Sequence, residues 1–177
     1  MHKKVLAVAL TAALVMPALT WAQAKGDFSG TWTFDEAKSD PAPARGGGGG
    51  GGGAPAGGGG GRGGGMGGGT ATKLVIKQTA GDLTVESTLA NGAQTAVYKL
   101  DGTESVNKMG MGEAKSQATW EGGNLVLTGK QMITTPQGEI EISTKEVYSV
   151  AGNVLTVTTT RTTQRGEQTR KLVFNKG

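Results

Sequence analysis

The segment KLVIKQTAGDLTVESTLANGAQTAVYKL, residues 73–100, carries the pattern that decides the fold. Apolar and polar residues alternate within short stretches, which is typical of half-buried β-strands. The intervening TAGD and LANG sequences supply glycine and asparagine for tight turns, so neighbouring strands are expected to pair antiparallel. The same pattern continues to the C-terminus, with turn signals recurring about every 8 to 12 residues.

Nine or ten stretches fit this pattern, and threonine, valine and isoleucine dominate them, as a pleated surface favours. The clear ones lie near residues 73–78, 83–88, 94–100, 115–120, 125–132, 140–150, 154–161 and 169–176. GTWTF at 30–34 precedes them, and ESVNKM at 104–109 adds a further short strand. A meander of this size avoids an exposed edge most simply by closing into an up-and-down barrel, with a two-sheet sandwich as the alternative.

The first residues predict export. Residues 1–24 combine MHKK, an apolar run and the sequence WAQA, in which Ala22 and Ala24 are the small residues that a signal peptidase needs. The run is shorter than the roughly 20 residues that span a bilayer, and Pro17 interrupts it. We therefore expect a cleaved signal, a mature chain that begins at Lys25 without an integral membrane segment, and a secreted or periplasmic location. The chain has no cysteine, which excludes a lipoprotein and disulfide bonds.

A glycine-rich tract divides the remaining chain. Residues 46–69 contain 19 glycines and one charged residue, Arg62. Glycine loses the most backbone entropy on folding and adds no apolar surface, so we expect a disordered insert. It separates a first strand and following loop, 25–45, from the remainder of a single barrel domain, 70–177. Arginine among glycines also occurs in RNA-binding segments, but two such arginines, Arg45 included, are too few to predict that function.

Composition excludes several classes of function. Without the predicted signal, 16 basic residues face 14 acidic ones, which is not the basic face that nucleic acid requires. The single histidine, His2, lies in that signal, so the mature chain has neither histidine nor cysteine. This removes the common nucleophile systems and the imidazole or thiolate metal sites. We expect a monomer with no catalytic residues, no metal and no cofactor; an enzyme that uses carboxylate or tyrosine chemistry is the third hypothesis.

Two groups of possible metal ligands have simpler interpretations. Asp35, Glu36 and Asp40 follow the first strand, but their spacing fits no calcium loop. Met109 and Met111 offer thioethers for a soft ion such as Cu(I). Because neither histidine nor cysteine stands beside them, an ordinary loop is the preferred interpretation.

The stretch FSGTWTFDEAKSD, 28–40, resembles the opening of lipocalin-like proteins, which carry Gly-x-Trp at the start of the first barrel strand. The mature chain is also similar to a group of secreted bacterial proteins with this opening, a DG hairpin, ATWEGGNLVLT in mid-chain and KLVFNK at the end. The resemblance covers nearly all of the mature chain outside the glycine tract.

This resemblance implies an all-β, antiparallel up-and-down meander that closes into a lipocalin-like barrel of about 8–10 strands. In such barrels a basic residue of the last strand covers the tryptophan at the closed end. Trp32 would be that tryptophan, and Arg170 or Lys171 its partner. A cation packed on an indole face contributes about 0.5–2 kcal/mol, so the role is structural.

One parity of each strand gives an interior that is apolar with a polar minority. Such a mixture suits a cavity that desolvates a small ligand and orients it with a few polar groups. The candidate ligand-binding residues are Tyr98, Trp120, Thr144, Glu146, Tyr148 and Arg161. The opposing interpretation is a packed barrel in which Glu146 pairs with an arginine. The sequence thus predicts a protein that binds a small, largely apolar or amphipathic molecule, with a structural or envelope-associated interaction module as the alternative.

Overall fold

The computed structural model describes residues 24–41, 70–109, 112–135, 138–164 and 166–177. The predicted signal and glycine insert lie outside these ranges, as do Met111 and the side chain of Met109, so the hypotheses on them stay predictions. In the described ranges, no helix has the length and apolar character needed to cross a membrane.

The described chain forms ten strands and one short 3-10 helix, η1 (Glu36–Lys38). The strands are β1 (Gly30–Phe34), β2 (Lys73–Gln78), β3 (Asp82–Leu89), β4 (Gly92–Lys99), β5 (Ser105–Met109), β6 (Gly112–Glu121), β7 (Asn124–Thr135), β8 (Gly138–Ala151), β9 (Val154–Thr163) and β10 (Gly166–Lys176). Every predicted stretch is confirmed as a strand. The later strands extend beyond the predicted bounds, because polar residues continue the ladders past the last apolar position.

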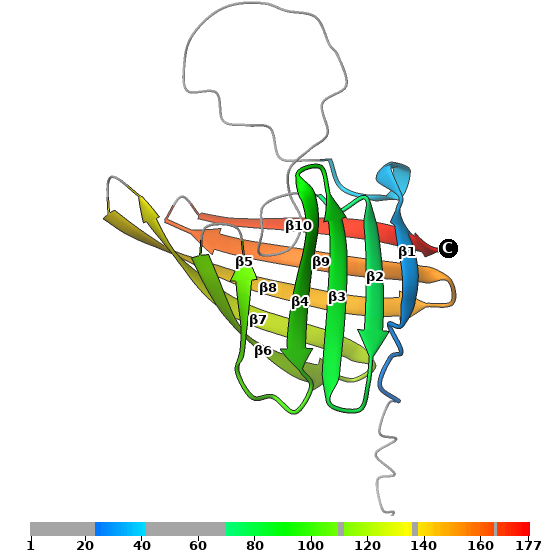
Figure 1. The fold of residues 1–177 in the computed structure, drawn as a ribbon. Coiled ribbons are helices and arrows are strands. Elements are labelled where there is room, and N and C mark those ends of the chain that lie inside the picture. The colour runs from blue at the N-terminus through cyan, green and yellow to red at the C-terminus, as the bar shows by residue number, and fades with distance from the viewer. Residues whose placement is uncertain (1–23, 42–69, 110–111, 136–137, 165) are drawn as a thin grey trace, which may run out of the picture.

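All ten strands belong to one antiparallel sheet in the order β4-β3-β2-β1-β10-β9-β8-β7-β6-β5. Sequence neighbours are paired except at one place, and β1 pairs with both β2 and β10. The sheet bends until its two edges, β4 and β5, meet, with β1 to β4 in front of the longer strands β6 to β10 (Figure 1). The predicted lipocalin-like barrel is confirmed, and the two-sheet sandwich is wrong.

The core lies inside this barrel, and its residues come from the predicted parity of the strands. The fully buried side chains include Leu83, Leu125, Leu127, Leu155 and Phe174. One cluster joins them to residues of both the front and the back of the barrel. The alternation in the sequence therefore decides which side chains face inward.

The end of the barrel where β1 begins is closed by the residues that precede this strand. The N–H of Gly26 donates to the carbonyl of Gly123 in the β6–β7 turn, 3.1 Å away, which ties the segment across the opening. Phe28 is fully buried there. Its ring stacks on Trp120 at 6.0 Å and meets Tyr148 edge-on at 6.1 Å. Phe28 is thus a plug of the barrel end that the sequence analysis did not identify.

Trp32 is also fully buried, at 0% exposure. Its Nε1 donates to the carbonyl of Phe28 at 2.8 Å. The cation over its ring is Lys176, with Nζ 5.2 Å from the ring centre, and not Arg170 or Lys171 as the resemblance implied. The reason is register: Trp32 lies directly opposite Lys176, and the other two residues are five or six positions away, about 17–20 Å along the strand.

The glycine of the Gly-x-Trp motif has a specific geometric role. Gly30 has a φ of +141°, and a Cβ there would lie 2.9 Å from Cε of Lys176. Only glycine accommodates both this backbone conformation and the lysine stem that passes over it to reach Trp32. The motif therefore belongs to the closure of the barrel.

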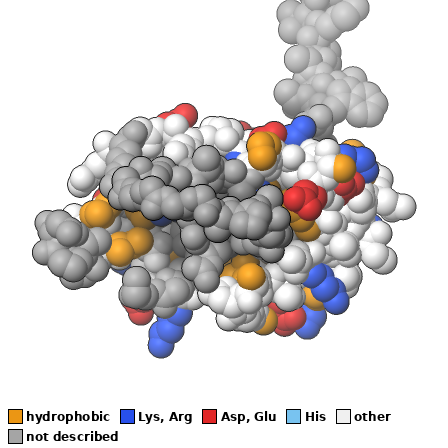
Figure 2. All heavy atoms as spheres, turned by 90° about the horizontal axis from the view of Figure 1, so that it is seen from above, with side chains coloured by type: hydrophobic (Ala, Val, Ile, Leu, Met, Phe, Trp, Pro, Cys, Tyr) orange, Lys and Arg blue, Asp and Glu red, His pale blue; other side chains and the backbone are white. Residues whose placement is uncertain are grey.

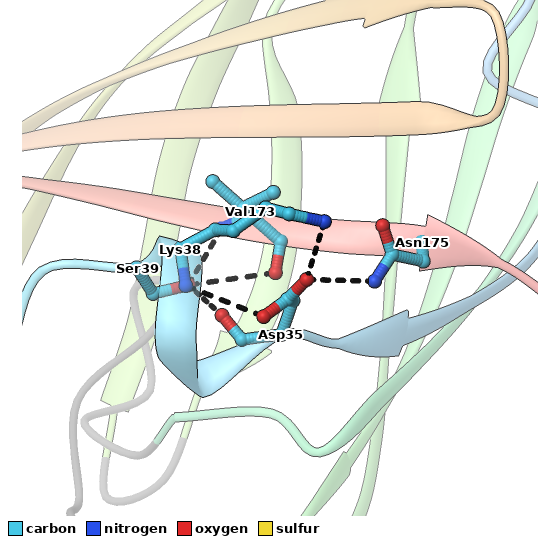
Figure 3. A network of polar contacts seen from close by, with 5 residues as sticks. All are labelled: Asp35, Lys38, Ser39, Val173 and Asn175. Carbon is cyan, nitrogen blue, oxygen red and sulfur yellow. Dashed lines mark hydrogen bonds and ion pairs between the residues drawn. The ribbon is translucent and has the colours of Figure 1, made fainter.

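Asp35 and its neighbours join η1 to β10 (Figure 3). Asp35 accepts from the N–H of Lys38 at 3.2 Å and from Nδ2 of Asn175 at 2.8 Å, and its carboxylate pairs with Nζ of Lys38 at 2.8 Å. These donors hold the pKa of Asp35 below its usual value. Asp40 accepts from the N–H of Lys171 at 2.7 Å. Asp35 and Asp40, two of the three acidic residues considered as cation ligands, thus fasten the loop after β1 to the last strand.

Candidate functional site in the barrel interior

A buried carboxyl group, that of Glu146 on β8, lies inside the barrel at 2% exposure. Its Oε2 accepts a hydrogen bond of 3.1 Å from the hydroxyl of Tyr148. Its Oε1 is buried and has no hydrogen-bond partner among the described residues. Burial raises the pKa of Glu146 to about 7, although the bond from Tyr148 acts in the opposite direction. In its ionised form Glu146 is therefore an interior acceptor that lacks a donor at Oε1 within the described chain.

Two tyrosines lie near this carboxyl group. Burial and the negative charge of Glu146 both raise the pKa of Tyr98 on β4 and of Tyr148. Both phenols consequently keep their protons at neutral pH, and the hydroxyl of Tyr148 acts as a donor to Glu146. The barrel brings Tyr98, Glu146 and Tyr148 together as the predicted parity requires.

A small cavity of about 30 Å³ adjoins Glu146. Glu146, Tyr148 and Ser87 form the polar part of its wall, and the remaining wall is contributed by Ala71, Leu74, Val157, Leu172 and Phe174. A cavity needs about 10–15 Å³ to hold one water molecule. The cavity accommodates a small polar group, whereas a larger ligand requires the barrel to open.

Small side chains continue the polar interior across β5 to β8. Ser105 lies opposite Ser116, Ser116 opposite Gly129, and Gly129 opposite Thr144. Gly129 brings no side chain into this row. Ser116 Oγ is buried without a hydrogen-bond partner in the described part of the chain. The same holds for Thr159 Oγ1, on the residue opposite Glu146.

The other candidate residues are Thr144, Trp120 and Arg161. Thr144 is buried in the row of small side chains. Trp120 lies at the closed end, where Nζ of Lys25 is 5.2 Å from its ring centre. Arg161 is exposed. Within the described chain, neither lysine nor arginine forms an ion pair with Glu146, so the pairing that the packed-barrel interpretation expected is not formed.

Arg170 shows why an inward parity does not by itself produce an ion pair. Its Nε donates to the carbonyl of Asp40 at 3.1 Å, and its Nη1 donates to Oγ1 of Thr70 at 2.9 Å. The guanidinium group is thus directed to the segments before and after the glycine tract. Its contacts anchor these two segments to β10.

The seam where β4 meets β5 is held by side chains. In the described chain, no backbone–backbone hydrogen bond joins these strands. Instead, Oδ1 of Asn107 accepts from the N–H of Val97 at 2.8 Å, and Nδ2 of Asn107 donates to the carbonyl of Val97 at 3.0 Å. Oγ of Ser105 accepts from the N–H of Lys99 at 2.8 Å. One carboxamide therefore substitutes for a pair of ladder bonds.

The outer surface of the seam carries two exposed valines beside the exposed Lys99 and Lys108. Val97 and Val106 are 42% and 54% exposed. Tyr98, between Val97 and Lys99, faces inward and interacts electrostatically with Glu146. At the seam, the edge strand β4 therefore has solvent on one face and the polar part of the interior on the other.

A wider, open groove of about 500 Å³ lies on the outer face of β6 to β9. Lys115 and Lys130 border it and pair with Glu104 at 3.3 Å and Glu141 at 3.0 Å. On the face that Figure 2 shows, basic and acidic side chains of the described residues lie at separate places around the edge of the molecule. The groove belongs to a surface of mixed charge, outside the barrel.

No known protein-family model matches the sequence, and no curated protein matches it. Solved structures that are similar in fold include the following two. One is a secretory abundant heat soluble protein from Ramazzottius varieornatus, with a TM-score of 0.45 and 20% identity over 59% of this chain and 70% of that chain. The other is the zebrafish ileal bile acid-binding protein in complex with cholic acid, with a TM-score of 0.44 and 21% identity over 59% and 72%. At these values the fold assignment rests on the strand pairing of this chain itself.

Proposed function

We propose that the protein binds a small amphipathic molecule inside the barrel, with the polar group of the ligand at Glu146. The observation that carries this proposal is the buried, unpartnered Oε1 of Glu146 beside a cavity. A buried acceptor without a donor costs free energy. A ligand that donates to it removes this cost and places its apolar part against the surrounding core side chains.

The ligand reaches this site through the seam between β4 and β5. Elsewhere around the barrel, continuous backbone ladders hold neighbouring strands together. At the seam, the contacts that must open include the side-chain bonds of Asn107 and Ser105 and the bond of 3.4 Å from Nε2 of Gln94 to the carbonyl of Lys108. Movement of this edge would uncover Tyr98 and then Glu146.

A second candidate function is a packed interaction module that takes no ligand. The observation that favours it is the size of the cavity, about 30 Å³. Ligand pockets for drug-sized molecules are typically about 300–1,000 Å³. The two functions differ in whether the barrel opens to admit a guest.

Binding of a neutral fluorescent amphiphile, N-phenylnaphthylamine, to the mature protein tests the two functions. Saturable binding with a blue-shifted emission is expected if the barrel takes a ligand, and Glu146→Leu should weaken it. Glu141→Gln is the matched control, because Glu141 lies on the same strand but pairs with Lys130 outside the barrel. Absence of saturable binding, together with no thermal stabilisation by the amphiphile, would leave the packed module as the function.

We also propose that the protein is exported. The composition of residues 1–24 supports this. N-terminal sequencing of protein recovered from the cell envelope or the medium should begin at Lys25. Recovery of the chain with MHKKVLAV attached would contradict the proposal.

A further inference from the structure

The chemistry of the interior points to a class of ligand, and this inference rests on the proposed function. We infer that the site at Glu146 selects amphiphiles with a primary amine head group over those with a carboxylate head group.

The first reason is that the described part of the site lacks a hydrogen-bond donor for Oε1 of Glu146. Tyr148 already supplies a donor to Oε2 of Glu146, and Oε1 has none among the described residues. Once Glu146 is ionised, a head group that fits must therefore donate a hydrogen bond to Oε1. An ammonium group offers three donors and a positive charge, whereas a carboxylate offers only acceptors.

The second reason is the absence of an interior cation in the described chain. Of the basic residues with inward parity, Arg161 is exposed, and Arg170 binds Asp40 and Thr70 at the loop segments. A carboxylate ligand would meet the carboxyl group of Glu146 without a compensating charge. Two carboxyl groups in one buried site disfavour ionisation of both, while an ammonium group favours the ionised form of Glu146.

The third reason is size. The cavity of about 30 Å³ has its polar wall at Glu146, Tyr148 and Ser87 and its apolar wall at Leu74, Val157 and Phe174. A primary ammonium group is about the size of a water molecule, so the existing space admits it. Only the alkyl chain then requires the seam to open.

Binding of an amine is expected to release protons from the protein. The titratable groups beside Glu146 are Tyr148 on its own strand and Tyr98 on β4. Leu74 of β2 and Ser87 of β3 line the adjoining cavity, and Leu127 of β7 and Thr159 of β9 lie opposite Glu146. Arg170 of β10 lies opposite Thr159 and is directed to the loop segments. Both phenols keep their protons, and Arg170 is engaged at the loops. Glu146 is thus the group that changes its protonation when an ammonium ion approaches, and a neutral alcohol would not cause this change.

The experiment compares octylamine, octanol and octanoate by isothermal titration calorimetry of the mature protein, all below their aggregation limits. Titrations at pH 6.0 in two buffers of different ionisation enthalpy count the protons released. We expect octylamine to bind at least about tenfold more tightly than octanoate, since a hydrogen bond to a charged group contributes that much. Only octylamine should release protons, and Glu146→Gln should remove both the preference and the release, while Glu141→Gln keeps them.

The outcomes separate this inference from the proposed function. If octanoate binds as tightly as octylamine, or octylamine binds without proton release, the amine preference is wrong although the barrel binds ligands. If none of the three compounds binds, the proposed function fails as well. Should Glu146→Gln not fold, as judged by circular dichroism, the proton count of the wild-type protein still decides, and Tyr148→Phe serves as the second variant.

Discussion

Stability should fall as the pH rises from about 4.5 to about 7, because folding raises the pKa of Glu146 from 4.5 to about 7. Below pH 4.5 the carboxyl group is protonated in both the folded and the unfolded chain. Between these values the unfolded chain loses its proton while the folded protein keeps it, so unfolding becomes more favourable as the pH rises. Above pH 7 both states are ionised, and the difference stays constant.

The size of this effect follows from the pKa difference. One pKa unit corresponds to about 1.36 kcal/mol, so the rise from 4.5 to about 7 predicts a loss of about 3 kcal/mol in the free energy of unfolding. Folding lowers the pKa of three aspartates, Asp27, Asp35 and Asp101. Their contributions to the free energy of unfolding are lost as the pH falls through these lowered pKa values. These aspartates therefore affect stability at a lower pH than Glu146 does.

Urea denaturation of the wild type and Glu146→Gln between pH 4 and pH 8 measures the effect. The difference in unfolding free energy between the two proteins should change by about 3 kcal/mol across this range in favour of the variant. Glu141→Gln removes an exposed carboxylate from the same strand and should show no such change between pH 5 and pH 8. Parallel stability curves for the wild type and Glu146→Gln would refute the buried, unpaired carboxyl group.

Further predictions concern the plug, the seam and the glycine tract. Trp32→Ala should lower the free energy of unfolding by about 3–5 kcal/mol in denaturant titration, as expected for a large buried aromatic; a change below 1 kcal/mol would contradict its role in closing the barrel. Asn107→Ala should cost about 1–3 kcal/mol and accelerate hydrogen exchange at the amide of Val97, and unchanged exchange would show that the carboxamide does not hold the seam. Deletion of 46–69 should leave the melting temperature nearly unchanged, because loop-closure entropy depends only weakly on length; a large drop would show that the tract contributes to the core.

The strands and the direction of their side chains could be predicted because both depend on local alternation. A residue two positions from a buried leucine in a strand is also on the inner face. This rule placed Glu146 and Tyr148 inside the barrel without knowledge of their neighbours. The same rule predicted Tyr98, since Ala96 and Leu100 lie on the same face of the chain and are buried.

Contacts that depend on register between distant strands could not be predicted in this way. The register of β1 against β10 determines which basic residue lies over Trp32, and no local pattern in the sequence specifies that register. The contacts at the seam also depend on register, because Asn107 bonds to Val97 only where the two edges of the sheet meet. Phe28 precedes the first strand, where the alternation ends, so its place under Trp120 had no signal beyond its apolar character.

A carboxyl group in a packed core needs a reason other than stability. Glu146 lies opposite Leu127, and a leucine at its place would avoid the cost of burying an acceptor without a donor. Replacing buried ionic groups with well-packed apolar side chains is often neutral or stabilising. A purely structural barrel would therefore be at least as stable with an apolar residue there. The unsatisfied oxygen, the adjoining space and a seam held by side chains occur together in this barrel, and the proposed binding of a small amphipathic molecule would account for all three.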